Sequence, residues 1–151
     1  MIKIIMSIGL LLSINLFADL VDDGLAEYKN GNSELAGEIY TKACADGSHN
    51  GSSNGCLNLG ILYYTGNGVE KDKIKARKLF AKACKSNSSK GCLNLGLIYN
   101  RGDGVKQDQL KAKYLFYKAC EAGNMGGCEQ YTILEKKGIG ISKSLNSILF
   151  N

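Results

Sequence analysis

The sequence predicts an all-α protein built from repeated helix-turn-helix units, and three observations support this class. Equivalent cysteines follow one another at a step of 36 residues, as Cys56, Cys92 and Cys128 show. Largely apolar and amphipathic helical patterns alternate along the chain. Short glycine-containing turns join these patterns, and the chain contains no proline. Repetition at this period is typical of solenoids, in which stacked units bury one continuous core.

The first eighteen residues have the pattern of a secretory signal peptide. Lys3 precedes an apolar run over residues 4–12, and Ala18 is a small residue at the expected cleavage site. The alternative, an uncleaved membrane anchor, is disfavoured because the run is short for a bilayer span. We therefore expect residues 1–18 to be a signal peptide and residues 19–151 to form one repeat domain, periplasmic or secreted, with no stable membrane span after cleavage.

The domain divides into about four units. The expected unit boundaries are about 19–46, 53–86, 89–122 and 125–151. The middle two units are regular, with apolar first helices over Gly55–Thr65 and Gly91–Arg101, whereas the outer two are degenerate, as terminal units of arrays usually are. A short second helix over Ser142–Phe150 is expected to close the array.

One irregularity interrupts the period. The step from Cys44 to Cys84 is 40 residues (84 − 44) instead of 36. We assign the four extra residues to the loop before Gly55, because loop-closure entropy grows slowly with length.

Glycines recur at two kinds of position. Gly60 and Gly96 lie inside predicted helices, where glycine costs about 1 kcal/mol relative to alanine. We expect an adjacent helix to approach closely there. The G-x-G turns at 66–69, 102–105 and 138–141 end helices. They do not resemble a dinucleotide-binding loop, because no strand precedes them and no third glycine follows.

The charge and ligand composition excludes several function classes. The net charge is +5, and the basic residues are dispersed, so no nucleic-acid surface is expected. His49 is the single histidine and stands in a polar stretch, so no metal site is expected. No cofactor motif is found.

Six cysteines in a small exported chain predict disulfides. Bridges within each helix pair, Cys56–Cys84 and Cys92–Cys120, would leave Cys44 and Cys128 unpaired at opposite ends of the array. Bridges across each loop leave none over. The expected pairs are Cys44–Cys56, Cys84–Cys92 and Cys120–Cys128.

The pattern LGxxYxxGxGV followed by KAxxLFxKAC resembles the SEL-like repeat, a relative of the tetratricopeptide repeat. Two units match its signature, first through Leu59, Gly60, Tyr63, Ala76, Phe80 and Ala83, and again through Leu95, Gly96, Tyr99, Ala112, Phe116 and Ala119. The added cysteine pairs resemble the exported bacterial cysteine-rich β-lactamase family. This resemblance implies a right-handed α-solenoid with disulfides between consecutive cysteines. It also implies penicillin binding or slow β-lactam hydrolysis.

The residues offer no recognisable machinery for that hydrolysis, so the catalytic residues stay unassigned. No serine stands three residues before a lysine, as a serine β-lactamase requires. A zinc enzyme would need several histidines. Cysteines in disulfides cannot act as thiolates.

The candidate ligand-binding residues lie on the predicted first helices, which line the concave surface of such solenoids. Asn58 and Asn94 occupy equivalent places, and a carboxamide can bind a peptide or a carboxylate. By the same register Tyr64 and Asn100 are expected to line the groove. The expected ligand is a peptide, a peptidoglycan fragment or a β-lactam. The alternative function is a non-catalytic protein-protein interaction scaffold.

Overall fold

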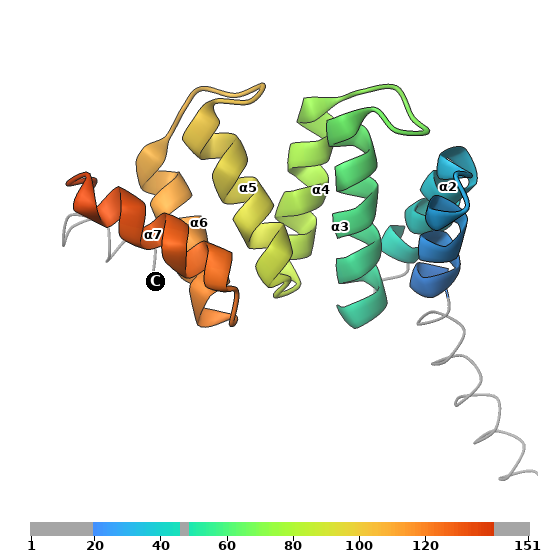
Figure 1. Ribbon diagram of the computed structural model, residues 1–151, viewed down its shortest axis with the longest axis horizontal. Helices are drawn as coiled ribbons and strands as arrows, with labels where there is room; N and C mark the ends of the chain where they lie inside the picture. Colours follow the sequence, from blue (N-terminus) through green and yellow to red (C-terminus); the bar gives the residue numbers. More distant parts are fainter. Residues whose placement is uncertain (1–19, 46–48, 141–151) are drawn as a thin grey trace, which may run out of the picture. The chain divides into compact units, whose positions relative to one another are not determined.

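The computed structural model describes residues 20–45 and 49–140, and all regular secondary structure in these two ranges is helical (Figure 1). A helix over residues 20–29 comes first. It is followed by α2 (Ser33–Ala45), α3 (His49–Thr65), α4 (Lys73–Lys85), α5 (Ser89–Arg101), α6 (Gln109–Glu121) and α7 (Met125–Lys136). The expected signal peptide and the expected helix over Ser142–Phe150 lie outside the described residues. Within the described ranges, no helix is both long and apolar enough to span a membrane.

The chain forms two compact units, Met1–Ser86 and Asn87–Asn151. In the first unit, α3 packs against both α2 and α4. The buried side chains come from the facing sides of these helices, and they include Ala36, Tyr40, Ala43, Leu59, Leu62, Ala76, Phe80 and Ala83. Small residues alternate with large ones in this set, which lets the helices approach closely while still filling the core.

In the second unit, α6 packs against both α5 and α7. The fully buried side chains of Ala112, Phe116 and Leu134 form the centre of its core. Partly buried side chains surround this centre, namely Leu93, Leu97, Tyr99, Tyr131 and Ile139. Ala112 and Phe116 stand 36 residues after Ala76 and Phe80, so the two units use the same second-helix positions for their cores.

Gly60 and Gly96 each contact the aromatic ring of the second helix of the same hairpin. A Cβ atom added at Gly60 would lie 2.7 Å from Phe80 Cε1, and one added at Gly96 would lie 2.6 Å from Phe116 Cε1. Both separations are far inside ordinary carbon–carbon contact, so only glycine fits at these positions. The expectation that an adjacent helix approaches closely at Gly60 and Gly96 is confirmed.

Capping residues define where the second helices begin. Asp72 accepts a hydrogen bond from the Lys75 backbone N–H at 2.8 Å, and Asp108 accepts one from Lys111 at 2.9 Å. These carboxylates satisfy amide groups that have no partner within the helix. At the other end of the turn, Gly102 closes α5 in the left-handed conformation with φ 74°. The G-x-G segments are therefore the expected helix-ending turns.

The start of α3 differs from the prediction. The helix begins at His49 rather than Gly55, and its 17 residues exceed the 13 of α5 by four. The extra residues therefore extend the helix, not the loop. Ser52 and Ser53 are buried, and Ser52 Oγ donates a hydrogen bond to the Cys44 carbonyl at 3.0 Å. This tertiary contact at the end of α2 outweighs the weak helix propensity of the Gly/Ser/Asn stretch.

Candidate functional site

Disulfides join the end of a second helix to the following first helix. Cys44 is bonded to Cys56 with a Cα–Cα distance of 4.5 Å, and Cys120 is bonded to Cys128 at 4.6 Å. These are the pairs expected from the sequence. Cys84 and Cys92 are also disulfide-bonded, and no cysteine is free. The cysteines therefore offer no thiolate for catalysis, and they indicate an oxidising compartment.

The first helices carry a repeated pair of side chains, an amide followed three residues later by an aliphatic residue. The pairs are Asn58 with Ile61, Asn94 with Leu97, and Gln130 with Ile133. Residues three apart share one face of a helix. The amides are half-buried, whereas Ile61 and Ile133 are each 37% exposed. The two pairs in the second unit, Asn94 with Leu97 and Gln130 with Ile133, are called the amide–aliphatic face.

Gln130 belongs to this series. The segment GGCEQY aligns with KGCLNL through Cys128 and Cys92, without an offset. Counting 36 residues from Asn94 places Gln130 in register, so an amide side chain occurs at this position in three consecutive repeats.

Asn58 has a partner within its own unit. Its side chain hydrogen-bonds the hydroxyl of Tyr40 on α2. Burial raises the pKa of Tyr40, and the hydrogen bond from Asn58 partly opposes this shift by favouring the phenolate. Phenylalanine replaces Tyr40 at the equivalent positions 80 and 116, so the hydroxyl does not recur. Within the described part of the chain, the Asn94 side chain makes no recorded hydrogen bond.

Tyr64 and Asn100, the other predicted groove residues, face the second helix of their own hairpins. Lys73 Nζ lies 5.8 Å from the ring centroid of Tyr64. At the equivalent place in the next repeat, Gln109 Nε2 donates to Asn100 Oδ1 at 3.4 Å. Six residues separate Asn58 from Tyr64, which places them about 120° apart around the helix axis. The four candidates therefore divide into two pairs on different sides of the first helices.

A shallow depression recurs beside each G-x-G turn. In the first unit it measures about 690 Å³ and is lined by Tyr63 and residues 69–75. In the second it measures about 840 Å³ and is lined by Tyr99, residues 105–110 and the turn at 138–140. Because the following turn enters the second depression, we interpret this feature as a joint between hairpins and not as a ligand pocket.

Repeated lysine–tyrosine contacts border these depressions. Lys75 Nζ lies 4.0 Å from the Tyr63 ring centroid and donates to its hydroxyl at 2.5 Å. Lys111 Nζ lies 4.2 Å from the Tyr99 ring centroid. These contacts were not predicted, although the signal, a tyrosine followed by a lysine twelve residues later, is present in both repeats.

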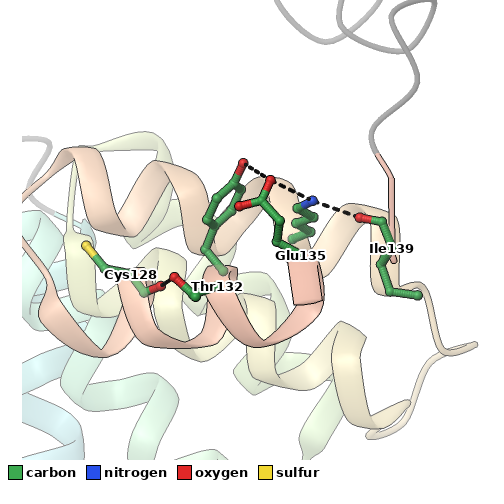
Figure 2. Close-up of polar contacts among 6 residues, drawn as sticks. Cys128, Thr132, Glu135 and Ile139 are labelled. Atoms are coloured by element: carbon green, nitrogen blue, oxygen red, sulfur yellow. Dashed lines mark hydrogen bonds and ion pairs between the residues drawn. The ribbon is translucent and has the colours of Figure 1, made fainter. Parts of the chain in front are cut away.

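A buried lysine fixes the last described turn. The Lys113 side chain donates a hydrogen bond to the Ile139 carbonyl at 2.8 Å and forms an ion pair with Glu135 at 3.6 Å (Figure 2). Its Nζ also lies 5.0 Å from the Tyr131 ring centroid. Burial raises the pKa of Tyr131, and the nearby Glu135 carboxylate raises it further. This cluster ties the end of α7 to α6, which is a structural role.

Metal-ligating groups do not converge in the structure. Among residues 20–45 and 49–140, no three histidine, cysteine, aspartate or glutamate side chains lie close enough together to hold a metal ion.

The structure therefore defines a class: a disulfide-bonded helical-repeat protein whose hairpins recur every 36 residues. The Sel1 repeat model matches residues 53–88 and 89–124. The chain is also 30% identical to cysteine-rich protein B of Helicobacter pylori, with a TM-score of 0.64, and covers 93% of that structure and 80% of its own length. The chain belongs to the Sel1 repeat family.

Other similar proteins extend beyond this chain. HcpC of Helicobacter pylori, which is named as a candidate beta-lactamase, is 44% identical over 54 residues, or 36% of this chain and 17% of HcpC. A protective antigen of uropathogenic Escherichia coli with an SLR fold has a TM-score of 0.73 at 30% identity. It matches 83% of this chain and 27% of its own length.

A Sel1 repeat protein from Oxalobacter formigenes has a TM-score of 0.72 at 27% identity, over 87% of this chain and 54% of its own. This chain thus spans well under two thirds of several of its relatives. The predicted fold class, an all-α solenoid of helix-turn-helix repeats with disulfides, is confirmed.

Proposed function

We propose that this protein is an exported binding protein, periplasmic or secreted, that holds a peptide or the peptide part of a peptidoglycan fragment on its first helices. The observation that supports this function is the amide–aliphatic face, which places an amide and an aliphatic side chain at equivalent positions in the two repeats of the second unit. Equivalent pairs in succession suit a ligand that is itself periodic, and an extended peptide backbone is such a ligand.

The chemistry of the pair fits a peptide. A carboxamide donates and accepts hydrogen bonds at once, so it can pair with both the N–H and the C=O of a backbone amide. The aliphatic side chain three residues later offers apolar contact to a ligand side chain. Asn94 is the best placed of the amides, because Asn58 already bonds Tyr40.

The test is titration calorimetry of the oxidised protein with purified muropeptides and with the corresponding free stem peptide. Replacing Asn94 with Ala should weaken binding about fivefold, because a hydrogen bond contributes roughly 1 kcal/mol. Replacing the exposed Asn30, which is not part of the amide–aliphatic face, with Ala removes the same chemical group and should leave affinity unchanged. A wild-type protein that binds neither ligand, or an Asn94 variant that binds as well as the Asn30 variant, would refute the proposal.

A second candidate is slow β-lactam hydrolysis, which the similarity to HcpC supports through that protein's name. A chromogenic β-lactam incubated with oxidised protein tests it directly. Turnover above that of a heat-denatured control supports hydrolysis. Equal rates leave β-lactams as ligands at most, since they resemble a cell-wall peptide terminus.

The remaining alternative is a protein-protein interaction scaffold. It predicts that neither muropeptides nor β-lactams raise the melting temperature of the folded protein. A ligand that binds only the folded state must raise the melting temperature. At a ligand concentration of one hundred times the dissociation constant, it increases the free energy of unfolding by about 2.7 kcal/mol.

A further inference from the structure

One exposed side of α4 is a row of four lysines, Lys75, Lys78, Lys82 and Lys85. Their spacing of three, four and three residues places them along one line of the helix. The row covers about 15 Å at 1.5 Å per residue. We call it the lysine row, and all four of its members are exposed.

Within α4, no negative charge balances the row. The thirteen residues of α4 include six basic residues and no acidic one, and no acidic residue occurs between Asp72 and Asp103. Lys75 donates to the Tyr63 hydroxyl, and Lys82 donates to the Cys44 carbonyl at 2.6 Å, so these hydrogen bonds go to uncharged acceptors. In the described part of the chain, no carboxylate is paired with any of the four. Like charges three or four residues apart destabilise a helix, so the lysine row lowers the stability of α4.

The repeat itself does not require these lysines. The buried positions of α4, Ala76, Phe80 and Ala83, recur in α6 as Ala112, Phe116 and Ala119. The row does not recur, because the equivalent positions in α6 carry Lys111, Tyr114, Lys118 and Glu121. In α2, which is offset by 40 residues, they carry Leu35, Glu38, Lys42 and Ala45. A feature that only one helix has, and that costs stability, points to a partner.

We propose that the lysine row binds a linear acidic polysaccharide. The row is one residue wide, which suits a narrow chain with regularly spaced negative groups. A bilayer surface fits less well, because the apolar face of α4 is buried in the core and cannot insert between lipids. Single-stranded nucleic acid fits less well, because its binding sites combine positive charge with aromatic stacking platforms, and the row contains no aromatic residue.

The experiment measures binding of the oxidised full chain to heparin, a linear sulfated polysaccharide, at several salt concentrations. Neutral dextran, oligo-dT and vesicles containing phosphatidylglycerol are measured in parallel. Four contacts to a single flexible chain predict a slope of about −2.8 in a plot of log affinity against log salt. We expect heparin to be bound more tightly than the other three probes.

Two matched variants distinguish an effect of the lysine row from an effect of the total net charge. The variant K78Q/K85Q removes two charges from the row, and K106Q/K136Q removes two from exposed lysines elsewhere. The first should weaken heparin binding about tenfold or more at low salt and halve the slope to about −1.4. The second should change neither appreciably. A further variant, K78Y/K85E, places on α4 the residues that α6 carries, which a helix of this repeat is known to accommodate.

Three results would overturn the proposal: no heparin binding, equal weakening in the two matched variants, or tighter binding to vesicles or oligo-dT than to heparin. Circular dichroism of each variant identifies one that fails to fold. In that case the other row variant decides the outcome. The row is on α4 and shares no residue with the amide–aliphatic face, so failure of heparin binding leaves the peptide-binding proposal standing, and the reverse also holds.

Discussion

Replacing Gly96 with Ala tests whether close helix contact, and not helix propensity, determines this position. An alanine Cβ would lie 2.6 Å from Phe116 Cε1 and 2.7 Å from Cδ1. Phe116 is fully buried at the centre of the second unit's core, beside Ala112 and Leu134. The ring therefore has no free space into which it could move.

The expected sign is opposite to that of an ordinary Gly-to-Ala change in a helix. Alanine is favoured over glycine by about 1 kcal/mol inside a helix. Overpacking a full core costs about 1–3 kcal/mol. Because the added Cβ would lie so close to the Phe116 ring, we expect a cost at the upper end of this range. The net expectation is a loss of about 2 kcal/mol, or about 4–8 °C in melting temperature for a chain of this size.

Denaturant unfolding of the oxidised protein, followed by circular dichroism, measures the change. The control is Gly126→Ala in α7, where the nearest atoms to an added Cβ are 3.2 and 3.4 Å away and are side-chain atoms. That variant should match or slightly exceed the wild type. Combining Gly96→Ala with Phe116→Leu should recover part of the loss through the shared contact. A Gly96→Ala protein as stable as the wild type would refute this account of the helix contact.

Two further predictions concern the disulfides and a buried tyrosine. Replacing Cys120 and Cys128 together by Ser should lower the free energy of unfolding by roughly 2.5 kcal/mol. Replacing Cys44 and Cys56 should lower it by about the same amount, because loop entropy changes little between separations of 8 and 12 residues. A near-zero loss in denaturant unfolding would contradict this prediction. The pKa of Tyr40 is raised by burial, so the stability it contributes is complete below about pH 10 and is lost as the pH rises through the raised pKa. Tyr40→Phe should therefore show a shallower decline than the wild type above pH 10, and parallel curves would show that the pKa of Tyr40 is the same in the folded and unfolded states.

Most of the hairpin architecture was predictable because it depends on local pattern and on the 36-residue period. Gly60 and Gly96 illustrate this, since a glycine inside an apolar helix has few explanations other than close contact. The start of α3 was not predictable from propensity. Gly, Ser and Asn are typical loop residues, and only the burial of Ser52 against the end of α2 makes them helical.

The candidate site was less predictable, because it depends on contacts between helices. Asn58 and Asn94 look identical in sequence, yet one bonds Tyr40 and the other has no such hydroxyl in the equivalent position. Lys113 is one of many dispersed lysines, and its burial follows from the turn at Ile139, which lies 26 residues away. The separation of Asn58 and Asn94 from Tyr64 and Asn100 was predictable, because a spacing of six residues places the two pairs about 120° apart around a helix.

The Cys44–Cys56 junction has a practical consequence for engineering. The sequence separation of its two cysteines is 12, whereas that of Cys120 and Cys128 is 8. The Cα–Cα distance within each bridge is nevertheless nearly the same. The covalent clamp thus holds its geometry regardless of how much chain it encloses. Foreign peptides grafted between Ala45 and His49, outside both helices, should be displayed without disturbing the hairpins on either side, which makes this point a permissive insertion site for epitopes or affinity tags.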